Sequence, residues 1–305
     1  MFDVIIIGAG PGGLGAGLYT GRGGFETLIL EGSFVGGQAA TTYEVDNYLG
    51  FDDTPSGSDL AEKMRSHAQK FGVQIKSENV IELSLEGKIK TVKTQQETYE
   101  AKSVIFAMGA KPRPLGADGE ERLRGMGVSY CATCDGAFFR GREVCVVGGG
   151  DTALEDALFL EKFCTKVTLI HRRDSFRAIK ALQDRVTASD KIEICYDSTV
   201  TKILGEDSVS GVVVKNLKDD RESQLDVSGI FIAVGNLPQS ELVRGLVDTD
   251  EAGYVLTDEN MRTNVPGVFA CGDVRKKPLR QIVTAVADGA VAAYSAQNYI
   301  LENEF

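Results

Sequence analysis

The sequence lacks several features that define broad classes of protein. No run of about 18 consecutive apolar residues occurs, so no transmembrane helix is predicted. No basic segment precedes the first apolar residues, so we expect no signal peptide. Positive charge is in deficit, because 33 basic against 44 acidic residues leave a net charge of −11. A surface this acidic repels nucleic-acid phosphates and anionic lipids, so we expect neither nucleic acid nor a membrane as a partner.

Metal ligands and structural disulfides are also scarce. Histidine occurs only as His67 and His171, and the six cysteines include a single Cys-x-x-Cys pair, Cys131 and Cys134. A zinc site needs four ligands, which this set does not supply, so no metal site is predicted. The cysteines do not form the framework of a secreted disulfide-rich domain, and we expect a cytoplasmic protein.

Glycine, by contrast, is abundant, with 35 residues against 7 prolines. The hydrophobic share of 43% is that of a folded protein, and 305 residues suit two domains better than one core. The glycines indicate many backbone positions where a Cβ atom would obstruct a turn or a ligand.

The amino-terminal segment has the pattern of an α/β dinucleotide-binding unit. Residues 4–7 form an apolar, β-branched run, residues 8–13 a G-x-G-x-x-G turn that opens a helix, and residues 27–30 a second apolar run. Glu31 follows at the place where a carboxylate binds the ribose hydroxyls. This combination favours nucleotide binding over the alternative of a plain glycine turn.

The turn itself supplies five candidate binding residues, which are Gly8, Gly10, Pro11, Gly12 and Gly13. Gly8 permits the tight turn, Gly10 lets the backbone approach a pyrophosphate, and Gly13 lets the helix lie close to the strand.

The same pattern recurs after residues 144–147. Here the turn is a G-x-G-x-x-A variant, and its candidate binding residues are Gly148, Gly150, Asp151, Thr152 and Ala153. A helix to about residue 163 and a strand over 167–170 are predicted to follow.

The second copy has no acid at the position equivalent to Glu31. His171 stands there, followed by Arg172, Arg173 and Arg177. A carboxylate would repel a 2′-phosphate, whereas arginine pairs with one in bidentate fashion, so this site is predicted to bind NADPH. The alternative is a solvated basic turn.

The Cys-x-x-Cys pair lies between the two turns, as Cys131-Ala132-Thr133-Cys134-Asp135. Closely spaced thiols of this kind are readily oxidised and reduced. Asp135 has two interpretations: a capping residue, or the acid that protonates a leaving thiolate. The second is favoured because neither histidine is well placed for that role.

A third segment indicates flavin. Residues 263–273 form a short strand that ends in Gly272 and Asp273, and an apolar helix begins near Arg280 and Gln281. The aspartate is a candidate to accept bonds from ribityl hydroxyls, and the helix start to face the flavin ring. Two nucleotide sites with a thiol pair favour an FAD enzyme over a non-catalytic, nucleotide-sensing binding protein.

Together these motifs resemble the bacterial-type, low-molecular-weight thioredoxin reductases, which are FAD- and NADPH-dependent pyridine nucleotide-disulfide oxidoreductases. The match runs nearly end to end, and the Cys-Ala-Thr-Cys-Asp segment before a second glycine turn is its most specific part. The resemblance rests on the segments 8–13, 36–38, 131–135, 148–151 and 171–173, with Arg177, Gly272, Asp273, Arg280 and Gln281.

The resemblance implies an α/β fold of two Rossmann-like, three-layer ββα domains, the second inserted into the first. The FAD domain would comprise residues 1–113 and 241–305, and the NADPH domain, with the cysteines, residues 114–240. It also implies a homodimer that reduces thioredoxin.

The likeness assigns further residues. Gly36, Gly37, Gln38 and Asn47 would lie around the flavin, as would Gly109. Cys134 would be the thiol nearest the flavin, and Cys131 the one that attacks thioredoxin. Three residues depart from the usual family pattern: Glu31, Met108 in place of threonine, and Cys271 in place of alanine.

Because the NADPH turn and the cysteines share one domain, we expect that domain to rotate during turnover about connectors at residues 111–114 and 235–238. Within enzymes, the alternatives are a relative that serves another redoxin or that draws electrons from ferredoxin.

Overall fold

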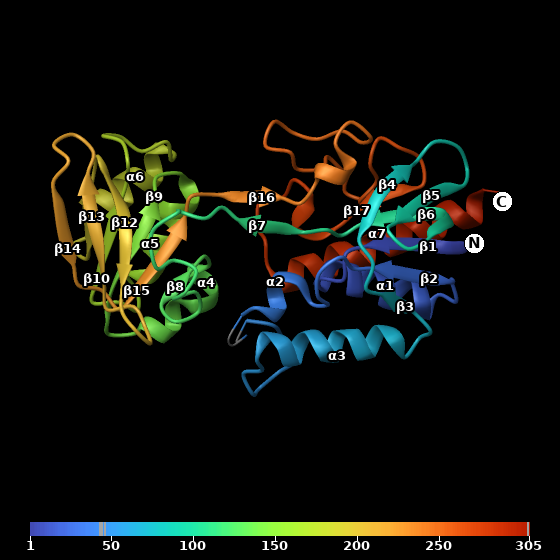
Figure 1. Ribbon diagram of the computed structural model, residues 1–305, viewed down its shortest axis with the longest axis horizontal. Coiled ribbons are helices and arrows are strands. Elements are labelled where there is room, and N and C mark those ends of the chain that lie inside the picture. Colours follow the sequence, from blue (N-terminus) through green and yellow to red (C-terminus); the bar gives the residue numbers. More distant parts are fainter. Residues whose placement is uncertain (43–44, 46, 304) are drawn as a thin grey trace. The chain divides into compact units, whose positions relative to one another are not determined.

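The computed structural model describes residues 1–305 except 43, 44, 46 and 304. The chain divides into two compact units, a discontinuous unit of Met1–Lys111 with Leu237–Phe305 and an inserted unit of Pro112–Asn236. The fold is α/β with one Rossmann-like unit inserted into the other, as predicted (Figure 1). The divisions lie a few residues before the boundaries expected from the sequence.

The discontinuous unit is built on a mixed sheet in the order β3-β2-β1-β6-β5-β4, with β17 also paired to β6. The strands paired in parallel are β1 (Phe2–Ile7), β2 (Thr27–Leu30), β3 (Gln74–Lys76), β6 (Thr98–Phe106) and β17 (Val268–Ala270). The antiparallel hairpin is β4 (Val80–Ser84) and β5 (Lys90–Thr94). The helices are α1 (Pro11–Arg22), α2 (Gly37–Ala40), α3 (Gly57–Gln69) and α7 (Ile282–Glu302).

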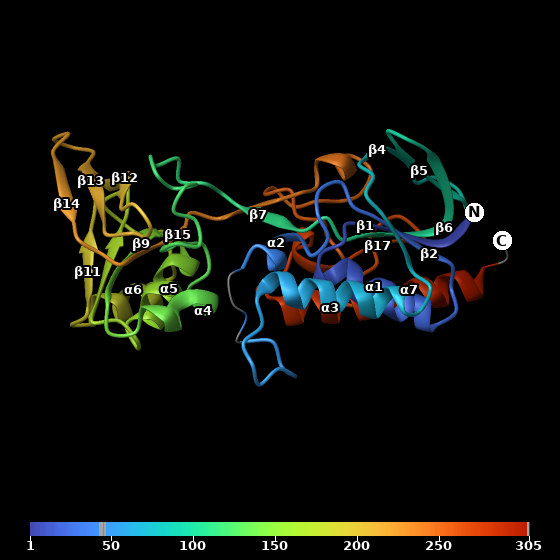
Figure 2. The same ribbon diagram turned by 60° about the horizontal axis from the view of Figure 1, so that its bottom comes forward.

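Alternate side chains of β1 enter two different cores. Val4 and Ile6 pack with the helices, whereas Ile5 and Ile7 pack with the β4–β5 hairpin. Successive side chains of a strand point to opposite faces, so a fully apolar strand is buried on both sides. Figure 2 shows α1, α3 and α7 together on one face of this sheet.

The inserted unit repeats this plan with a sheet in the order β11-β10-β9-β15-β8, parallel throughout. Its strands are β8 (Val128–Ser129), β9 (Glu143–Gly148), β10 (Lys166–Ile170), β11 (Ile192–Cys195) and β15 (Gly229–Ala233). Its helices are α4 (Ala132–Asp135), α5 (Asp151–Leu160) and α6 (Lys180–Thr187). A separate antiparallel sheet consists of β12 (Ser198–Leu204), β13 (Gly211–Asn216) and β14 (Glu222–Leu225).

The central strand β9 again separates two cores. Val144 and Val146 pack with α5 and α6, and Cys145 and Val147 pack with β12 and β13. Helices on one face of the parallel sheet and an antiparallel sheet on the other make the predicted three-layer ββα arrangement.

Two short strands connect the units. β7 (Ala110–Pro112) and β16 (Asn236–Pro238) pair with each other as a two-stranded sheet. On either side of them the Arg113 amide donates to the Gly235 carbonyl at 2.9 Å, and the Gln239 amide to the Gly109 carbonyl at 2.9 Å. The chain therefore leaves and re-enters the discontinuous unit through one paired connector.

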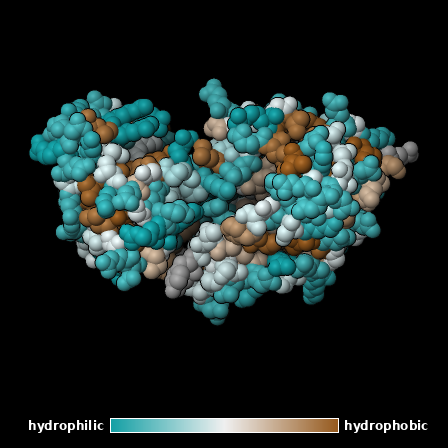
Figure 3. Space-filling view, viewed as in Figure 1, coloured by the Kyte–Doolittle hydropathy of each residue, from teal (hydrophilic) through white to brown (hydrophobic). Residues whose placement is uncertain are grey.

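The face of the molecule drawn in Figure 3 is hydrophilic over most of its area, with hydrophobic side chains in separate patches. In the part of the chain that the structure describes, no helix is both long and apolar enough to cross a membrane.

Candidate active site

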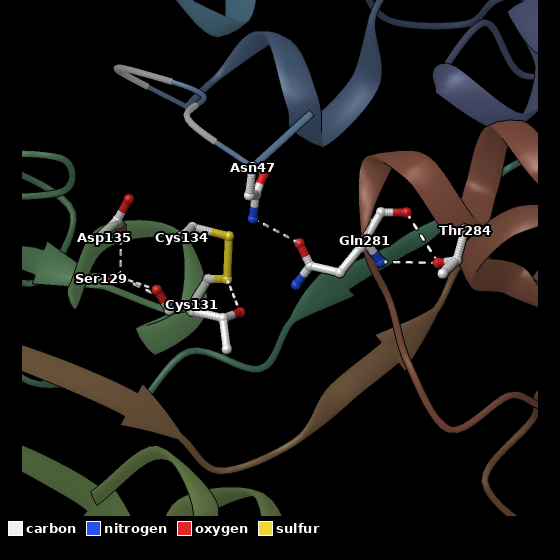
Figure 4. The surroundings of a disulfide bond; sticks show 8 residues. Asn47, Ser129, Cys131, Cys134, Asp135, Gln281 and Thr284 are labelled. Carbon is white, nitrogen blue, oxygen red and sulfur yellow. Dashed lines mark hydrogen bonds between the residues drawn. A yellow bond between two sulfur atoms is a disulfide. The ribbon is translucent and has the colours of Figure 1, made fainter. Parts of the chain in front are cut away.

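The Cys-x-x-Cys pair forms a disulfide at the start of a short helix in the inserted unit. Cys131 is the N-cap residue of α4, and its Sγ is bonded to that of Cys134, with the two Cα atoms 5.3 Å apart (Figure 4). The Cys134 amide donates to the Cys131 carbonyl at 3.2 Å, which closes the turn. Ala132, between them, is fully buried and joins the core under α5. Both cysteines are partly exposed.

Asp135 ends α4 and is held by a residue that the sequence analysis did not identify. The Ser129 hydroxyl on β8 donates to Asp135 Oδ2 at 2.6 Å, and the Cys131 amide donates to Ser129 Oγ at 3.1 Å (Figure 4). Asp135 is half-buried, and its own amide donates to the Cys131 carbonyl at 3.1 Å. The acid predicted from the sequence is therefore linked to the redox pair by both main chain and side chain.

A second hydrogen-bonded link involves Tyr130, the residue directly before Cys131. The Tyr130 hydroxyl donates to Glu120 Oε1 at 2.6 Å, and the same carboxylate accepts from the three backbone amides of residues 115–117. Burial opposes ionisation of Glu120, but these hydrogen bonds outweigh it and hold its pKa below the usual value. Burial, followed by the bond to Glu120, raises the pKa of Tyr130. The chain that follows the first connector is thus tied to the residue before Cys131.

The first glycine turn has the shape that a dinucleotide requires. Gly8 has a φ of +105°, and a Cβ there would lie 2.4 Å from the Ala107 carbonyl oxygen. A Cβ on Gly13 would lie 1.9 Å from the Gly8 oxygen, whereas one on Gly10 would meet no atom within 4 Å. The two crowded glycines make the turn, and the open one leaves the backbone accessible to a ligand.

The helix that begins at this turn is suited to an anion. Gly10 is the N-cap of α1, Pro11 occupies the first turn, and no described side chain caps these amides. Unpaired amides and the positive end of a helix favour a phosphate. The residues present therefore fit the pyrophosphate of FAD.

Glu31 lies directly after β2 and faces the same turn. Its Oε2 accepts from the Ala9 amide at 2.7 Å and its Oε1 from the Ser33 amide at 2.8 Å. Each carboxylate oxygen has a further lone pair for a ribose hydroxyl. The two amides hold the carboxylate beside the turn, where the sequence placed it.

The other residues assigned by resemblance are distributed around this unit. The Gly36 amide donates to the Ala9 carbonyl at 2.8 Å, which brings α2, with Gly37 and Gln38, to the turn. Asn47 Nδ2 donates to Gln281 Oε1 at 3.1 Å (Figure 4). Gly109 lies at the start of the connector, with a φ of +72°.

The helix predicted to start near Arg280 begins instead at Ile282. Gln281 is its N-cap and exchanges hydrogen bonds with Thr284, so Arg280 and Gln281 precede the helix. The Arg280 guanidinium lies 4.2 Å from the centre of the Tyr254 ring, a cation–π contact that orients it.

One carboxylate oxygen of Asp273 is buried and unsatisfied within the described part of the chain. Its Oδ1 is buried without a hydrogen-bond partner among the described residues, as is the Nε atom of Arg280. Burial raises the pKa of Asp273, although Lys277 and Arg280 act in the opposite direction. A buried polar atom without a partner is costly, and hydroxyl groups of a ligand would satisfy it. This observation fits the ribityl chain of FAD.

A buried ion network that the sequence analysis missed lies next to Asp273. Asp288, on α7, accepts from Arg275 at 3.1 Å, from Lys277 at 2.7 Å and from the Gly272 amide at 3.1 Å. The acid is thus placed to fix the loop that carries Asp273. No local motif marks it, because its partners come from another element.

The second glycine turn lies in the inserted unit. A Cβ on Gly148 would lie 2.4 Å from the Ala233 oxygen and 2.6 Å from the Cβ of Ala153, whereas one on Gly150 would be in open space. Asp151 Oδ1 accepts from the Ile179 amide at 2.8 Å, and Thr152 is exposed. This turn too leaves one glycine open to a ligand, at the start of α5.

The residues after β10 divide into one buried histidine and three exposed arginines. The His171 ring lies against Gly149 and is 3.0 Å from the Ser175 carbonyl oxygen through Nε2. Burial lowers the pKa of His171, and the charges of the nearby arginines add to this, although the bond to Ser175 acts in the opposite direction. The ring is therefore neutral at pH 7 and supports the turn. The exposed residues are Arg172, Arg173 and Arg177, and none of them forms an ion pair with a described residue. Three guanidinium groups without anions beside a glycine turn fit the 2′-phosphate of NADPH.

No cluster of three or more His, Cys, Asp or Glu side chains suited to a metal occurs among the described residues.

Comparison with known proteins gives consistent matches over nearly the whole chain. Residues 2–289 match the model of the pyridine nucleotide-disulphide oxidoreductase family. A thioredoxin reductase of Listeria innocua is 49% identical over 99% of this chain and 95% of its own length. One of Peptoclostridium acidaminophilum is 46% identical, over 99% of this chain and 98% of its own. The crystal structure of the Streptococcus pyogenes thioredoxin reductase is 46% identical, with a TM-score of 0.93 and 99% of each chain covered.

Proposed function

The chain belongs to the pyridine nucleotide-disulphide oxidoreductase family, and from this premise we propose how its two units divide the work of a thioredoxin reductase. The enzyme uses FAD and NADPH. When bound, FAD supplies two-electron chemistry between the hydride of NADPH and the Cys131–Cys134 disulfide. The reduced pair then passes two electrons to the disulfide of thioredoxin.

The discontinuous unit holds FAD. The turn at residues 8–13 and the free amides of α1 receive the pyrophosphate, and Glu31 binds the ribose. Asp273, whose Oδ1 is buried without a partner among the described residues, accepts from the ribityl hydroxyls. Gly36, Gly37, Gln38, Asn47, Gly109, Arg280 and Gln281 complete the site.

The inserted unit holds NADPH. The pyrophosphate lies at the turn of Gly148, Gly150, Asp151, Thr152 and Ala153. Arg172, Arg173 and Arg177 bind the 2′-phosphate, and the neutral His171 ring shapes the turn beneath it. These arginines support NADPH over NADH, and over an enzyme that takes its electrons from ferredoxin.

The cysteines and Asp135 carry the thiol chemistry. Reduction of the disulfide consumes two electrons and two protons and leaves two thiols. Cys131 attacks thioredoxin as a thiolate, a mixed disulfide forms, and attack by Cys134 on Cys131 releases reduced thioredoxin and restores the Cys131–Cys134 bond. Asp135 donates the proton that the departing thiolate needs.

Larger-scale properties follow from this division. NADPH and the cysteine pair belong to the same unit, and both have to reach the FAD that the discontinuous unit holds. The inserted unit therefore rotates about β7 and β16 between the two half-reactions. The resemblance to thioredoxin reductases supports a homodimer in the cytoplasm, and the net charge of −11 disfavours a nucleic-acid or membrane partner.

The single observation that carries this function is the partly exposed Cys131–Cys134 disulfide, followed directly by Asp135, in the unit that also bears the arginine-rich turn. The test is to mix the purified, FAD-loaded protein with NADPH or NADH, follow flavin bleaching, and then add oxidised thioredoxin. Bleaching should be much faster with NADPH, and thioredoxin should restore the flavin colour.

Two variants separate the half-reactions. Arg172→Ala should weaken NADPH binding and narrow the preference over NADH, while Cys131→Ser should leave bleaching intact and abolish thioredoxin reduction. An enzyme that keeps full thioredoxin reduction after Cys131→Ser would refute the assigned chemistry. Bleaching by reduced ferredoxin in place of NADPH would indicate the alternative electron donor.

A further inference from the structure

One polar side chain near the disulfide contacts both parts of the thiol machinery. Ser129 is only 5% exposed, and it lies on β8, whose backbone is paired with β15 opposite Phe231. Its Oγ lies 2.6 Å from Asp135 Oδ2 and 3.1 Å from the amide nitrogen of Cys131. A buried side chain on a paired strand has a fixed position, so both contacts are held in place by the sheet (Figure 4).

The proton of the hydroxyl has a definite place. A serine hydroxyl offers one proton and two acceptor lone pairs. The Cys131 amide donates to the oxygen, and the hydroxyl proton has two possible acceptors: Asp135 Oδ2 at 2.6 Å and the Cys131 carbonyl at 3.3 Å. Hydroxyl-to-carboxylate bonds are characteristically about 2.5–2.7 Å, so the proton goes to Asp135.

We propose that Ser129 is a positioning residue for the thiol step, because its hydroxyl joins the Asp135 carboxylate and the Cys131 backbone in one hydrogen-bonded unit. The inference rests on the proposed role of Asp135 as proton donor. Ser129 does not touch the reacting sulfurs; it acts through Asp135.

The chemical consequence follows from which form of Asp135 the hydroxyl stabilises. When Asp135 gives its proton to a thiolate, a carboxylate remains, and the Ser129 hydroxyl donates to that carboxylate. A hydrogen bond to the ionised form favours ionisation. Ser129 therefore makes the proton easier to release and keeps the carboxyl group oriented after release.

The experiment measures the thiol half-reaction alone. Enzyme reduced by one equivalent of NADPH is mixed with oxidised thioredoxin, and the return of flavin absorbance is recorded between about pH 5 and 9. The variants are Ser129→Ala, Ser129→Thr, Asp135→Asn and the Ser129→Ala/Asp135→Asn double variant. The rate of bleaching by NADPH is measured in parallel, because a general structural defect would lower that rate too.

The expected result has three parts. Ser129→Ala moves the midpoint of the pH profile upward by about one pH unit, the size expected from loss of one hydrogen bond to a carboxylate. Ser129→Thr keeps the hydroxyl and the parent midpoint. Asp135→Asn removes the limb of the pH profile that reports the ionisation of Asp135, and adding Ser129→Ala to this variant changes nothing further.

Three outcomes overturn the proposal, and they separate a failure of Ser129 from a failure of Asp135. If Asp135→Asn removes the limb but Ser129→Ala leaves its midpoint in place, or if Ser129→Ala still moves the profile in the Asp135→Asn background, Ser129 does not act through the acid. If Asp135→Asn leaves the profile unchanged, the proposed role of Asp135 itself fails, and the role of Ser129 fails with it.

Discussion

Removal of the charge on Asp288 is predicted to destabilise the discontinuous unit. Asp288 forms ion pairs with Lys277 at 2.7 Å and Arg275 at 3.1 Å. The exposed fractions of these side chains are 11% for Asp288, 5% for Lys277 and 14% for Arg275. Asp288→Asn keeps the size of the side chain but removes the charge that pairs directly with the buried ammonium of Lys277.

The magnitude follows from the burial. An exposed ion pair contributes little because water already solvates both charges. Removing one partner of a buried pair costs about 3–5 kcal/mol, because the remaining charge stays out of water without compensation. For a unit of this size, about 3 kcal/mol corresponds to a Tm lower by roughly 6–12 °C.

The assay is thermal unfolding of the holoenzyme, followed by the fluorescence of released flavin. A matched control is Glu82→Gln, which breaks the exposed Lys93–Glu82 pair in the same unit and should leave the Tm unchanged. Adding Lys277→Met to Asp288→Asn removes the stranded charge and should recover a large part of the loss. A Tm of Asp288→Asn equal to that of the Glu82→Gln control would refute the buried-network argument.

Two other predictions concern the inserted unit. Burial, followed by the charge of Glu155, raises the pKa of Asp156 to about 7. Between about pH 4 and 7 the folded state therefore binds more protons than the unfolded state. Stability is lost as the pH rises through that window. Asp156→Asn should therefore raise the free energy of unfolding by about 4 kcal/mol at pH 8 and by almost nothing below pH 4, and urea titrations showing the same change at both pH values would contradict this. Tyr130→Phe removes the 2.6 Å hydrogen bond to Glu120 and should lower the free energy of unfolding by about 2 kcal/mol. Tyr196→Phe, at an exposed tyrosine, is the control, and equal urea midpoints for these two variants would show that the Tyr130 bond contributes nothing.

The glycine turns and the redox pair were predictable from the sequence because their signals are local. In both turns the strand, the crowded glycine and the open glycine lie within a few residues of one another. Gly8 and Gly148 are crowded by backbone, so the residue type reports the geometry directly. The same holds for Cys131 and Cys134, whose spacing alone allows the disulfide.

Other expectations needed the structure to refine them. The basic segment after β10 was predicted as one phosphate site, but the fold separates a buried, neutral His171 from three exposed arginines. The helix expected from Arg280 begins at Ile282, because Gln281 caps it through Thr284. Burial and capping depend on what packs around a residue, which spacing along the chain does not encode.

The supporting residues were found only in the tertiary structure. Ser129 lies six positions before Asp135, Glu120 ten before Tyr130, and Asp288 sixteen after Gly272, and each pair is brought together by a return of the chain. None of these polar residues belongs to a motif, so each looks like an ordinary surface side chain in the sequence. A local pattern can specify a backbone shape, whereas a hydrogen bond or ion pair between separate elements exists only once those elements have packed.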